Sequence, residues 1–338
     1  MKPNKRTLPL QGLRVLLMMG IVLLHTYGKP ILGSGGELVS FYFVVSGFLY
    51  RDKMSWINYV KKKVVTIYPV YWIVLLFYLS KSYHAGCLTI GWGIFPHILL
   101  IQSWIPMNGV EYAFQYVGVA WFLSSLLFCY ILSPILYKYV NSGSILKAKG
   151  VLIGAFFLVC FFHHFDGDNG YGLWFAYISP YCRVIEYVMG MFLWQIIQEK
   201  KYMVLSKEKE IFALLFIIVY WVVICKQVLG GATCGLHVAC VACCYLFKSK
   251  MVNLLYANKL IVRFAPYIMF VYLSHQSLIL HFDSLRMITE EFLANVMDVR
   301  LMMVAYCWVG GIIFGLCFSM IKSIILSRNK VLNNKYRQ

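Results

Sequence analysis

The stretch of sequence that decides the fold is LPLQGLRVLLMMGIVLLHTYG, residues 8–28. It has the length and apolar character of a helix that crosses the hydrocarbon core of a bilayer, for which about 20 residues suffice. Comparable apolar runs recur along the chain, because 61% of the 338 residues are hydrophobic and only 13% are charged. A soluble globule of this length cannot bury such a large apolar fraction. The sequence therefore predicts an all-α integral membrane protein, with 1–338 as a single domain.

Ten segments are predicted to form transmembrane helices. They are 9–28, 36–51, 64–81, 119–138, 150–165, 178–197, 211–229, 232–247, 264–281 and 300–326. One more apolar segment, 87–105, is interrupted by Gly91, Gly93 and Pro96. If that segment does not cross, the cytoplasmic side holds 24 of the 31 Lys and Arg residues and the outer side holds 5. The positive-inside rule therefore favours a bundle of about ten helices with both termini cytoplasmic and a re-entrant or interfacial segment near 87–105.

The formal net charge of +18 follows from this topology, so we expect a lipid bilayer and no nucleic acid as partner. The run 61–63 consists of three lysines and is denser than topology requires. It would face anionic lipid or a soluble polyanion such as a nucleotide phosphate. The cysteines, including the cluster Cys240, Cys243 and Cys244, lie mainly in apolar runs. They are interpreted as small core residues, and no metal site is expected.

The first helix carries two ionisable residues, Arg14 and His25, which lie eleven positions apart. At 100° per residue this spacing is three turns and about 20°, so both side chains project from one face and are separated by about 16 Å along the axis. Either residue alone has an ordinary explanation, since Arg14 can snorkel to headgroups and His25 can bond a neighbouring carbonyl. The pair on one face points instead to function, because ionisable groups inside a span are costly.

Other polar residues lie in predicted spans. Arg183 and Glu186 are three apart, which fits both an intrahelical ion pair and the lining of a polar cavity. His275 lies in the outer half of the ninth span and Trp121 near the outer interface. Gly47 is expected to serve close helix packing.

Further motifs surround these residues. They are FYFVVSGFLY (41–50), KKKVVTIYPVYW (61–72), QSWIP (102–106), WFLSSLLFCYILSP (121–134), CRVIEYVMGMFLW (182–194) and VYLSHQ (271–276). With the Arg and His of the first helix, they follow one another over nearly the whole chain in a family-specific order. The chain resembles the membrane-bound acyltransferase family three, integral membrane enzymes that acylate sugars of the bacterial cell surface.

This resemblance implies an O-acyltransferase of the cell (plasma or inner) membrane. It would move an acyl group, with acetyl expected, from cytoplasmic acyl-CoA to a hydroxyl of a cell-surface polysaccharide or its lipid-linked precursor. Acetyl-CoA or another acyl-CoA is then a co-substrate, and no bound cofactor is expected. Arg14 and Lys63 are expected to bind the donor, and His25 with Arg14 to form the catalytic pair. The residues expected to bind the acceptor or line its pocket are Trp121, Arg183, Glu186 and His275.

Two positions depart from the family pattern. Many members have two Arg spaced by two residues where this chain has Lys63 and Thr66, and a carboxylate where it has Leu126. Two chemical routes stay open, because His25 can act as general base or can itself be acylated first. The main alternative function is a transporter or flippase for a lipid-linked sugar, and a structural subunit of a surface-polymer assembly is a further one. No inverted repeat or pair of broken helices typical of transporters is evident in the sequence.

Overall fold

The computed structural model describes residues 5–51, 54–84, 91–164, 170–227, 229–293 and 299–335. Within these ranges the regular secondary structure is helical apart from one pair of two-residue strands, so the expected all-α fold is confirmed. The contacts divide the chain into two compact units, Met1–Ala265 and Pro266–Gln338, each of which is described by itself.

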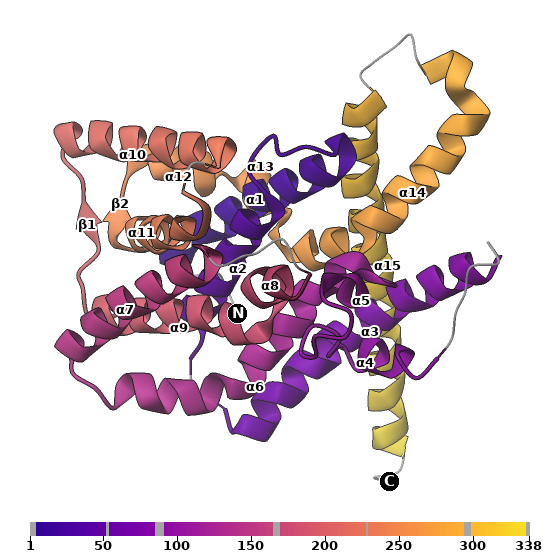
Figure 1. Cartoon of the computed structure of the whole chain (residues 1–338), viewed down its shortest axis with the longest axis horizontal. Helices are drawn as coiled ribbons and strands as arrows, with labels where there is room; N and C mark the ends of the chain where they lie inside the picture. The colour runs from indigo at the N-terminus through magenta and orange to yellow at the C-terminus, as the bar shows by residue number, and fades with distance from the viewer. Residues whose placement is uncertain are drawn as a thin grey trace. The chain divides into compact units, whose positions relative to one another are not determined.

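The N-terminal unit is built mainly from long helices (Figure 1). They are α1 (Leu8–Tyr27), α2 (Gly35–Leu49), α3 (Trp56–His84), α6 (Trp121–Asn141), α7 (Ile145–His164), α9 (Pro180–Ile197), α10 (Lys207–Lys226) and α11 (Thr233–Leu246). Short helices link them, namely α4 (Ile94–Ile98), α5 (Val110–Phe114), α8 (Gly170–Leu173), α12 (Lys250–Tyr256) and α13 (Lys259–Val262). Single turns are η1 (Lys5–Thr7), η2 (Gly118–Ala120), η3 (Trp174–Ile178) and η4 (Gly230–Ala232), and η5 (Ala265–Tyr267) begins at the last residue of this unit. Strands β1 (Met203–Val204) and β2 (Phe247–Lys248) pair in parallel.

The ten segments predicted as transmembrane all overlap helices, but only some have the full length of a span. In the described ranges, five helices are long and apolar enough to cross a membrane: Lys5–Tyr27, Trp56–His84, Gly118–Asn141, Ile145–His164 and Val299–Ile325. The pair Lys250–Val262 and Ala265–Phe282 passes the same test jointly. Gly35–Leu49 and Gly230–Leu246 are shorter apolar helices. Several apolar helices are thus present, and the number of ten crossings stays a prediction, as does the side on which each terminus lies.

The described part of the unusual segment, 91–105, forms only one short helix, α4, and then turns. Five helical residues extend about 7 Å, which is too short to cross a bilayer. Aromatic side chains of α3 donate hydrogen bonds to backbone carbonyls at and just after the end of α4. The pairs are Tyr68 with Leu99 at 2.6 Å, Tyr71 with His97 at 2.6 Å and Trp72 with Ile98 at 2.9 Å. The segment is therefore fastened to α3 along its backbone.

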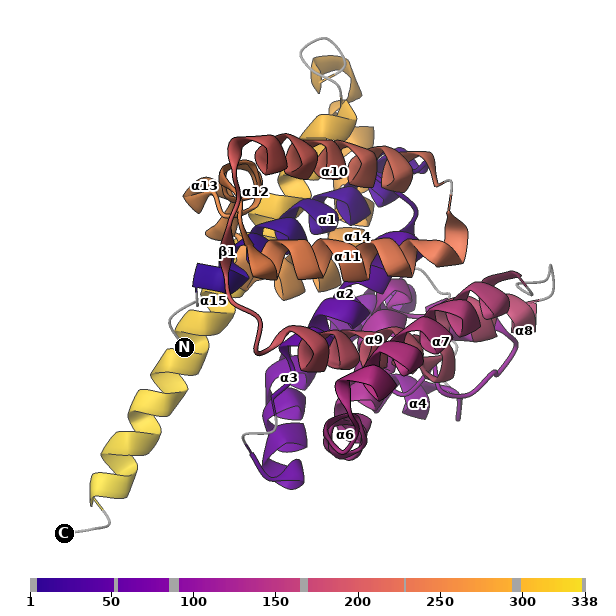
Figure 2. The same cartoon turned by 90° about the vertical axis from the view of Figure 1, so that its left-hand side faces the viewer.

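The core of the N-terminal unit lies where α2 and α9 pack closely against each other. A side chain at Gly47 would collide with the carbonyl of Tyr187, and one at Gly190 with the carbonyl of Val44. The expectation that Gly47 serves close packing is confirmed, because small residues let two helix backbones approach. Figure 2 shows α11 between α10 and α9, so that α2 and α9 are covered on that side.

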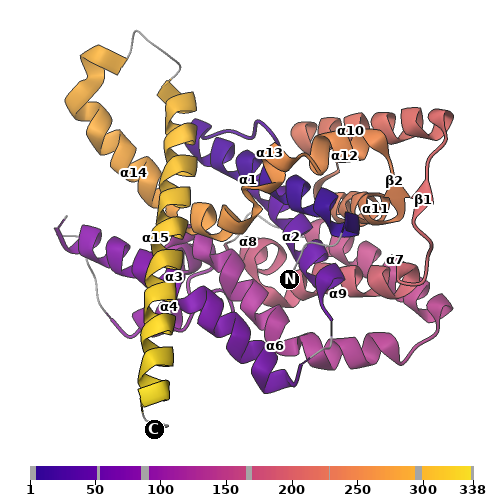
Figure 3. The same ribbon diagram turned by 180° about the vertical axis from the view of Figure 1, so that it is seen from behind.

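The C-terminal unit contains two long helices, α14 (Ile268–Leu293) and α15 (Val299–Lys335), which lie against each other (Figure 3). Their contact uses small residues as well. A Cβ on Gly311 of α15 would lie 2.7 Å from the Cα of Val271, and one on Gly310 would lie 2.8 Å from the side chain of Leu278. The glycines therefore set how closely α15 approaches α14.

Candidate functional site

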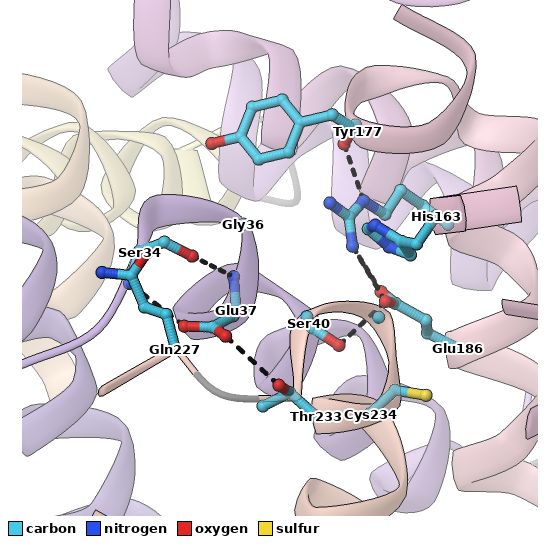
Figure 4. Close-up of a pocket in the computed structure, with 13 residues that line it drawn as sticks. Ser34, Gly36, Glu37, Ser40, His163, Tyr177, Glu186, Gln227, Thr233 and Cys234 are labelled. Carbon is cyan, nitrogen blue, oxygen red and sulfur yellow. Dashed lines mark hydrogen bonds and ion pairs between the residues drawn. The ribbon is translucent and has the colours of Figure 1, made fainter. Parts of the chain in front are cut away.

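A polar cavity of ≈ 230 Å³ lies where α2, α9 and α11 begin and α7 ends (Figure 4). All of its lining residues belong to the N-terminal unit. They are Ser34, Gly36, Glu37, Ser40, His163, Tyr177, Arg183, Glu186, Gln227, Gly230, Gly231, Thr233 and Cys234. Burial of so many polar groups requires hydrogen-bond partners, and most of them have partners within the cavity wall.

Helix α2 begins at the cavity with a capping box formed by Ser34 and Glu37. The Ser34 hydroxyl accepts a hydrogen bond from the Glu37 N–H, and a carboxylate oxygen of Glu37 accepts one from the Ser34 N–H, both at 3.3 Å. Thr233 at the start of α11 donates its hydroxyl to the other carboxylate oxygen, also at 3.3 Å. Glu37 is therefore held from both its own helix and a neighbouring one, and its side chain is buried in the cavity wall.

The backbone of Glu37 is fixed by a buried histidine. His237 Nε2 lies 2.7 Å from the carbonyl oxygen of Glu37, and His237 Nδ1 lies 3.1 Å from the Tyr220 hydroxyl. A carbonyl can only accept, so Nε2 carries the proton and Nδ1 accepts from Tyr220. His237 thus has a structural role that requires its neutral form.

Arg183 and Glu186 form the charged part of the cavity wall. Their side chains are 1% and 2% exposed, and Arg183 Nη1 lies 2.8 and 3.0 Å from the two carboxylate oxygens of Glu186. Arg183 Nε donates to the Tyr177 carbonyl at 2.7 Å, and Ser40 of α2 donates to Glu186 at 2.8 Å. The two predictions for this pair, an intrahelical ion pair and a cavity lining, are therefore both correct.

Two aromatic rings cover the guanidinium group of Arg183. Its Cζ lies 5.8 Å from the ring centre of Trp121 and 5.5 Å from that of Tyr177. The two rings contact each other with centroids 4.9 Å apart. Tyr177 can approach because Gly36 lacks a side chain, since a Cβ there would lie 2.5 Å from the Tyr177 ring. The structure therefore places Trp121 against the Arg183–Glu186 pair, although Trp121 is not among the residues that line the cavity, and a shared acceptor pocket stays a prediction.

Arg14 and His25 lie elsewhere on α1, and neither belongs to the lining of the cavity in the described chain. Arg14 is half-buried, donates from Nη1 to the Gln11 side chain at 3.1 Å, and lies 6.0 Å from the Tyr42 ring centre. His25 occupies the last turn of α1 with an exposed side chain. The helix ends there because Gly28 adopts a left-handed conformation, with φ of 65°.

Lys63 has a different set of neighbours. Its Nζ lies 4.0 Å from the ring centre of Tyr130 and 5.4 Å from that of Tyr59. At the two positions that depart from the family pattern, Thr66 donates its hydroxyl to a backbone carbonyl of its own helix at 2.7 Å, and Leu126 is a buried core residue.

His275 belongs to α14 in the C-terminal unit. Its side chain is fully buried, and Nδ1 lies 2.6 Å from the carbonyl oxygen of Tyr272. The Cys307 thiol of α15 donates to the backbone carbonyl of His275 at 3.6 Å. The expected contribution of His275 to an acceptor pocket stays a prediction.

Several cavity residues were missed by reasoning from the sequence. They are Glu37, His163, Gln227 and Thr233. One signal was readable, because Ser34-x-x-Glu37 before an apolar run is the capping-box pattern that starts a helix. For the others no local pattern exists, since α7, α10 and α11 meet only through the fold.

The described fold is that of an all-helical membrane protein with a buried polar site. Comparison with known proteins identifies its family. The chain belongs to the membrane-bound acyltransferase family three, because the model of the acyltransferase domain matches residues 9–328. It is also similar to the acyltransferase MdmB of Streptomyces mycarofaciens, with 27% identity over 194 residues. That match covers 51% of this chain and 48% of the relative, so it spans about half the length of each protein. No solved structure matches the chain.

Proposed function

We propose that this acyltransferase moves an acyl group, with acetyl expected, from cytoplasmic acyl-CoA to a hydroxyl of a cell-surface polysaccharide or its lipid-linked precursor. The observation that carries the proposal is the closeness of the polar cavity to the end of α1. A Cβ on Gly35 would lie 3.2 Å from Leu24 of α1 and 2.9 Å from the Tyr177 hydroxyl of the cavity wall. His25 lies in the same last turn of α1 as Leu24, so its backbone is within one helical turn of the cavity wall, which supports a base near the rim of an acceptor cavity.

The proposed reaction is a direct acyl transfer. The neutral imidazole of His25 removes the proton of a sugar hydroxyl, because that hydroxyl is too weak an acid to attack unaided. Its oxygen forms a bond to the thioester carbonyl carbon, the carbon–sulfur bond breaks, and the leaving thiolate of CoA takes the proton. In the two-step variant, His25 carries the acyl group between donor and acceptor.

The donor is proposed to bind through cations on the cytoplasmic side. Arg14 presents a half-buried guanidinium within α1, and Lys63 presents an ammonium against an aromatic ring. Both groups suit charge-assisted hydrogen bonds to nucleotide phosphates. Their separate neighbours favour contact with different parts of the donor rather than one shared phosphate.

The acceptor is proposed to bind in the cavity beside Trp121, Arg183 and Glu186, with His275 as a further acceptor residue. The polar lining supports this role, because a hydroxyl-rich ligand needs both donors and acceptors at close range. We also propose ten membrane crossings, both termini in the cytoplasm, a re-entrant segment at 87–105, and residence in the plasma membrane.

The deciding experiment measures transfer of labelled acetyl from acetyl-CoA to polysaccharide fragments by the full chain in sealed vesicles. We expect transfer only when the donor is supplied on the cytoplasmic side and the acceptor on the outer side. Transfer confined to acceptor on the cytoplasmic side would overturn the outer placement of the site. Loss of polymer export in a gene deletion without any change in acyl mass of the polymer would favour the transporter instead.

A further inference from the structure

We infer that the cavity binds one uncharged pyranose ring of the acceptor and that Glu37 is the residue that excludes sugars bearing a carboxylate. This inference deepens the proposed function and rests on it. It concerns the chemical class of the acceptor and a residue to which no role has been given beyond capping α2.

The charged groups of the cavity wall disfavour a ligand that carries a carboxylate. The positive charge of Arg183 is already compensated by Glu186, which lies 2.8 Å away. Glu37 receives hydrogen bonds only from the neutral groups of Ser34 and Thr233, and in the described chain no Lys or Arg forms an ion pair with it. The described cavity wall therefore carries two carboxyl groups, Glu37 and Glu186, against one guanidinium group. A carboxylate brought into this buried space would meet like charge without a compensating cation.

Most N–H groups of Arg183 are already used by the protein itself. Nε and Nη1 are occupied by the Tyr177 carbonyl and Glu186, whereas Nη2 is buried without a partner in the described chain. Because Nη2 is enclosed by protein atoms, it does not face the cavity as a free donor. A carboxylate binds arginine best through two parallel N–H bonds, which are not available here. Arg183 therefore offers an incoming carboxylate no bidentate binding site.

The volume and the lining of the cavity fit a single sugar ring. The cavity of ≈ 230 Å³ is smaller than pockets for drug-sized ligands, which have about 300–1,000 Å³, so it suits one sugar ring. Figure 4 shows Glu37, Ser40, Thr233 and Glu186 facing this space, which offers carboxylate acceptors and hydroxyl groups that both donate and accept. The ring of Tyr177 adds an apolar face against which the C–H face of a pyranose can pack.

The structure also explains why Glu37 rather than Glu186 sets the selectivity. Glu186 is neutralised by Arg183 and bonded by Ser40, so it acts as part of a neutral pair. Glu37 is buried, hydrogen-bonded in place and uncompensated. Removal of its charge with retention of its shape should therefore relax the exclusion of acidic sugars.

The test uses the full chain in lipid nanodiscs at pH 8 and saturation-transfer NMR with matched pairs of ligands. The probes are the methyl glycosides of glucose and galactose and the corresponding methyl glucuronide and galacturonide. Each pair differs only in a CH₂OH or a carboxylate group. We expect at least one neutral glycoside to bind, with a preference over its acid of about tenfold or more, since like charge in a buried site costs several kcal/mol.

The variant is Glu37→Gln, which can still form a capping box. We expect it to reduce the preference to less than about threefold, while the matched control Glu111→Gln, at an exposed position of α5, leaves the ratio unchanged. Equal binding of neutral and acidic probes by the unmodified protein would overturn the inference, as would binding of none of the four. An unchanged ratio in Glu37→Gln would remove Glu37 from the selection, and the ratio for the unmodified protein decides by itself whether the cavity excludes acidic sugars.

Acyl transfer is measured separately on the same preparations, which keeps the two proposals distinguishable. Transfer to a carbohydrate together with indifference to the carboxylate would refute the charge selection and leave the acyltransfer proposal intact. Selective binding of neutral probes without transfer to any carbohydrate would refute the proposed function and leave the sugar site standing.

Discussion

His25 lies in the last turn of α1, where a substitution removes little packing because the side chain is exposed. We expect His25→Ala to reduce acyl transfer by about 10²–10⁴-fold, the usual cost of losing a general base, without preventing insertion. The measurement is the rate of transfer of labelled acetyl, with His84→Ala at the exposed end of α3 as the matched control. Near-complete activity of His25→Ala would remove the residue from the mechanism.

Arg14 allows a second test at the level of a single side chain. Arg14→Lys keeps the charge but loses the planar, multi-donor guanidinium group. We expect the KM for acyl-CoA to rise by about tenfold, the equivalent of one charged hydrogen bond, and the rate to recover partly at high donor concentration. Titration of the donor measures this, with Arg263→Lys, an exposed site, as the control. An unchanged KM would show that the donor does not contact Arg14.

His97 predicts a dependence of stability on pH. Its side chain is fully buried in the α4 segment, and burial lowers its pKa from 6.5 to about 4. The unfolded chain therefore binds a proton at a higher pH than the folded protein does. The contribution of His97 to the free energy of unfolding should be complete above pH 6.5 and fall as the pH drops toward 4. Below pH 4 this group should cause no further loss. The full effect is about 3 kcal/mol.

The check is the thermal unfolding midpoint of the protein between pH 7 and 4. His97→Phe keeps a ring between Tyr112 and Tyr116, whose centroids lie 4.9 and 4.8 Å from the imidazole. We expect this variant to lose part of the pH dependence, whereas His84→Phe keeps it. The same slope in both variants would assign the effect to other groups.

For single residues, the sequence predicted part of the candidate site. Arg183, Glu186 and Trp121 were recognised because charged or interfacial side chains in an apolar run need an explanation, and the structure brings them together. Glu37 and His163 escaped, since one resembles an ordinary helix cap and the other lies at a helix end. Their relation to Arg183 depends on tertiary packing of α2, α7 and α9, which no local pattern encodes.

The contact between α2 and α9 is the feature to test at the level of elements. Gly190→Ala would place a methyl group against the carbonyl of Val44, so we expect the unfolding free energy to fall by about 1–3 kcal/mol or more. Gly154→Ala on α7 is the matched control, because a Cβ there meets nothing within 4 Å and alanine favours a helix. Thermal unfolding in detergent provides the comparison. Equal stability of the two variants would contradict the close packing.

Most elements could be predicted from hydrophobicity, because each of the ten apolar segments overlaps a helix in the described ranges. Their full role as spans could not be derived with the same certainty, since α2 and α11 are short and α9 carries a buried ion pair. The described part of the segment near 87–105 forms only the short helix α4, consistent with its glycine and proline residues, and its re-entrant or interfacial position stays a prediction. The three hydrogen bonds from α3 that fasten it were not predictable from sequence.

For the whole molecule, the distribution of charge predicts the topology. With 24 Lys and Arg residues assigned to the cytoplasm and 5 to the outside, single cysteines introduced in 106–116 should react with a membrane-impermeant maleimide from outside. Cysteines in 200–209 should react only after the cytoplasmic side is opened. The unmodified chain, with its own cysteines, is the control. External labelling at 200–209 would show that the predicted orientation is inverted or that a predicted crossing is absent.

The capping box at Ser34 and Glu37 has a consequence for how this protein can diverge. The same carboxylate starts helix α2 and, on our inference, sets the charge of the acceptor site. A lineage that shifted to acidic acceptors by placing lysine or arginine at this position would lose the acceptor group that caps the helix. Glutamine alone removes the charge and keeps the cap. A change of acceptor should therefore pass through Glu37→Gln first, with any new cation introduced at a different position of the cavity wall.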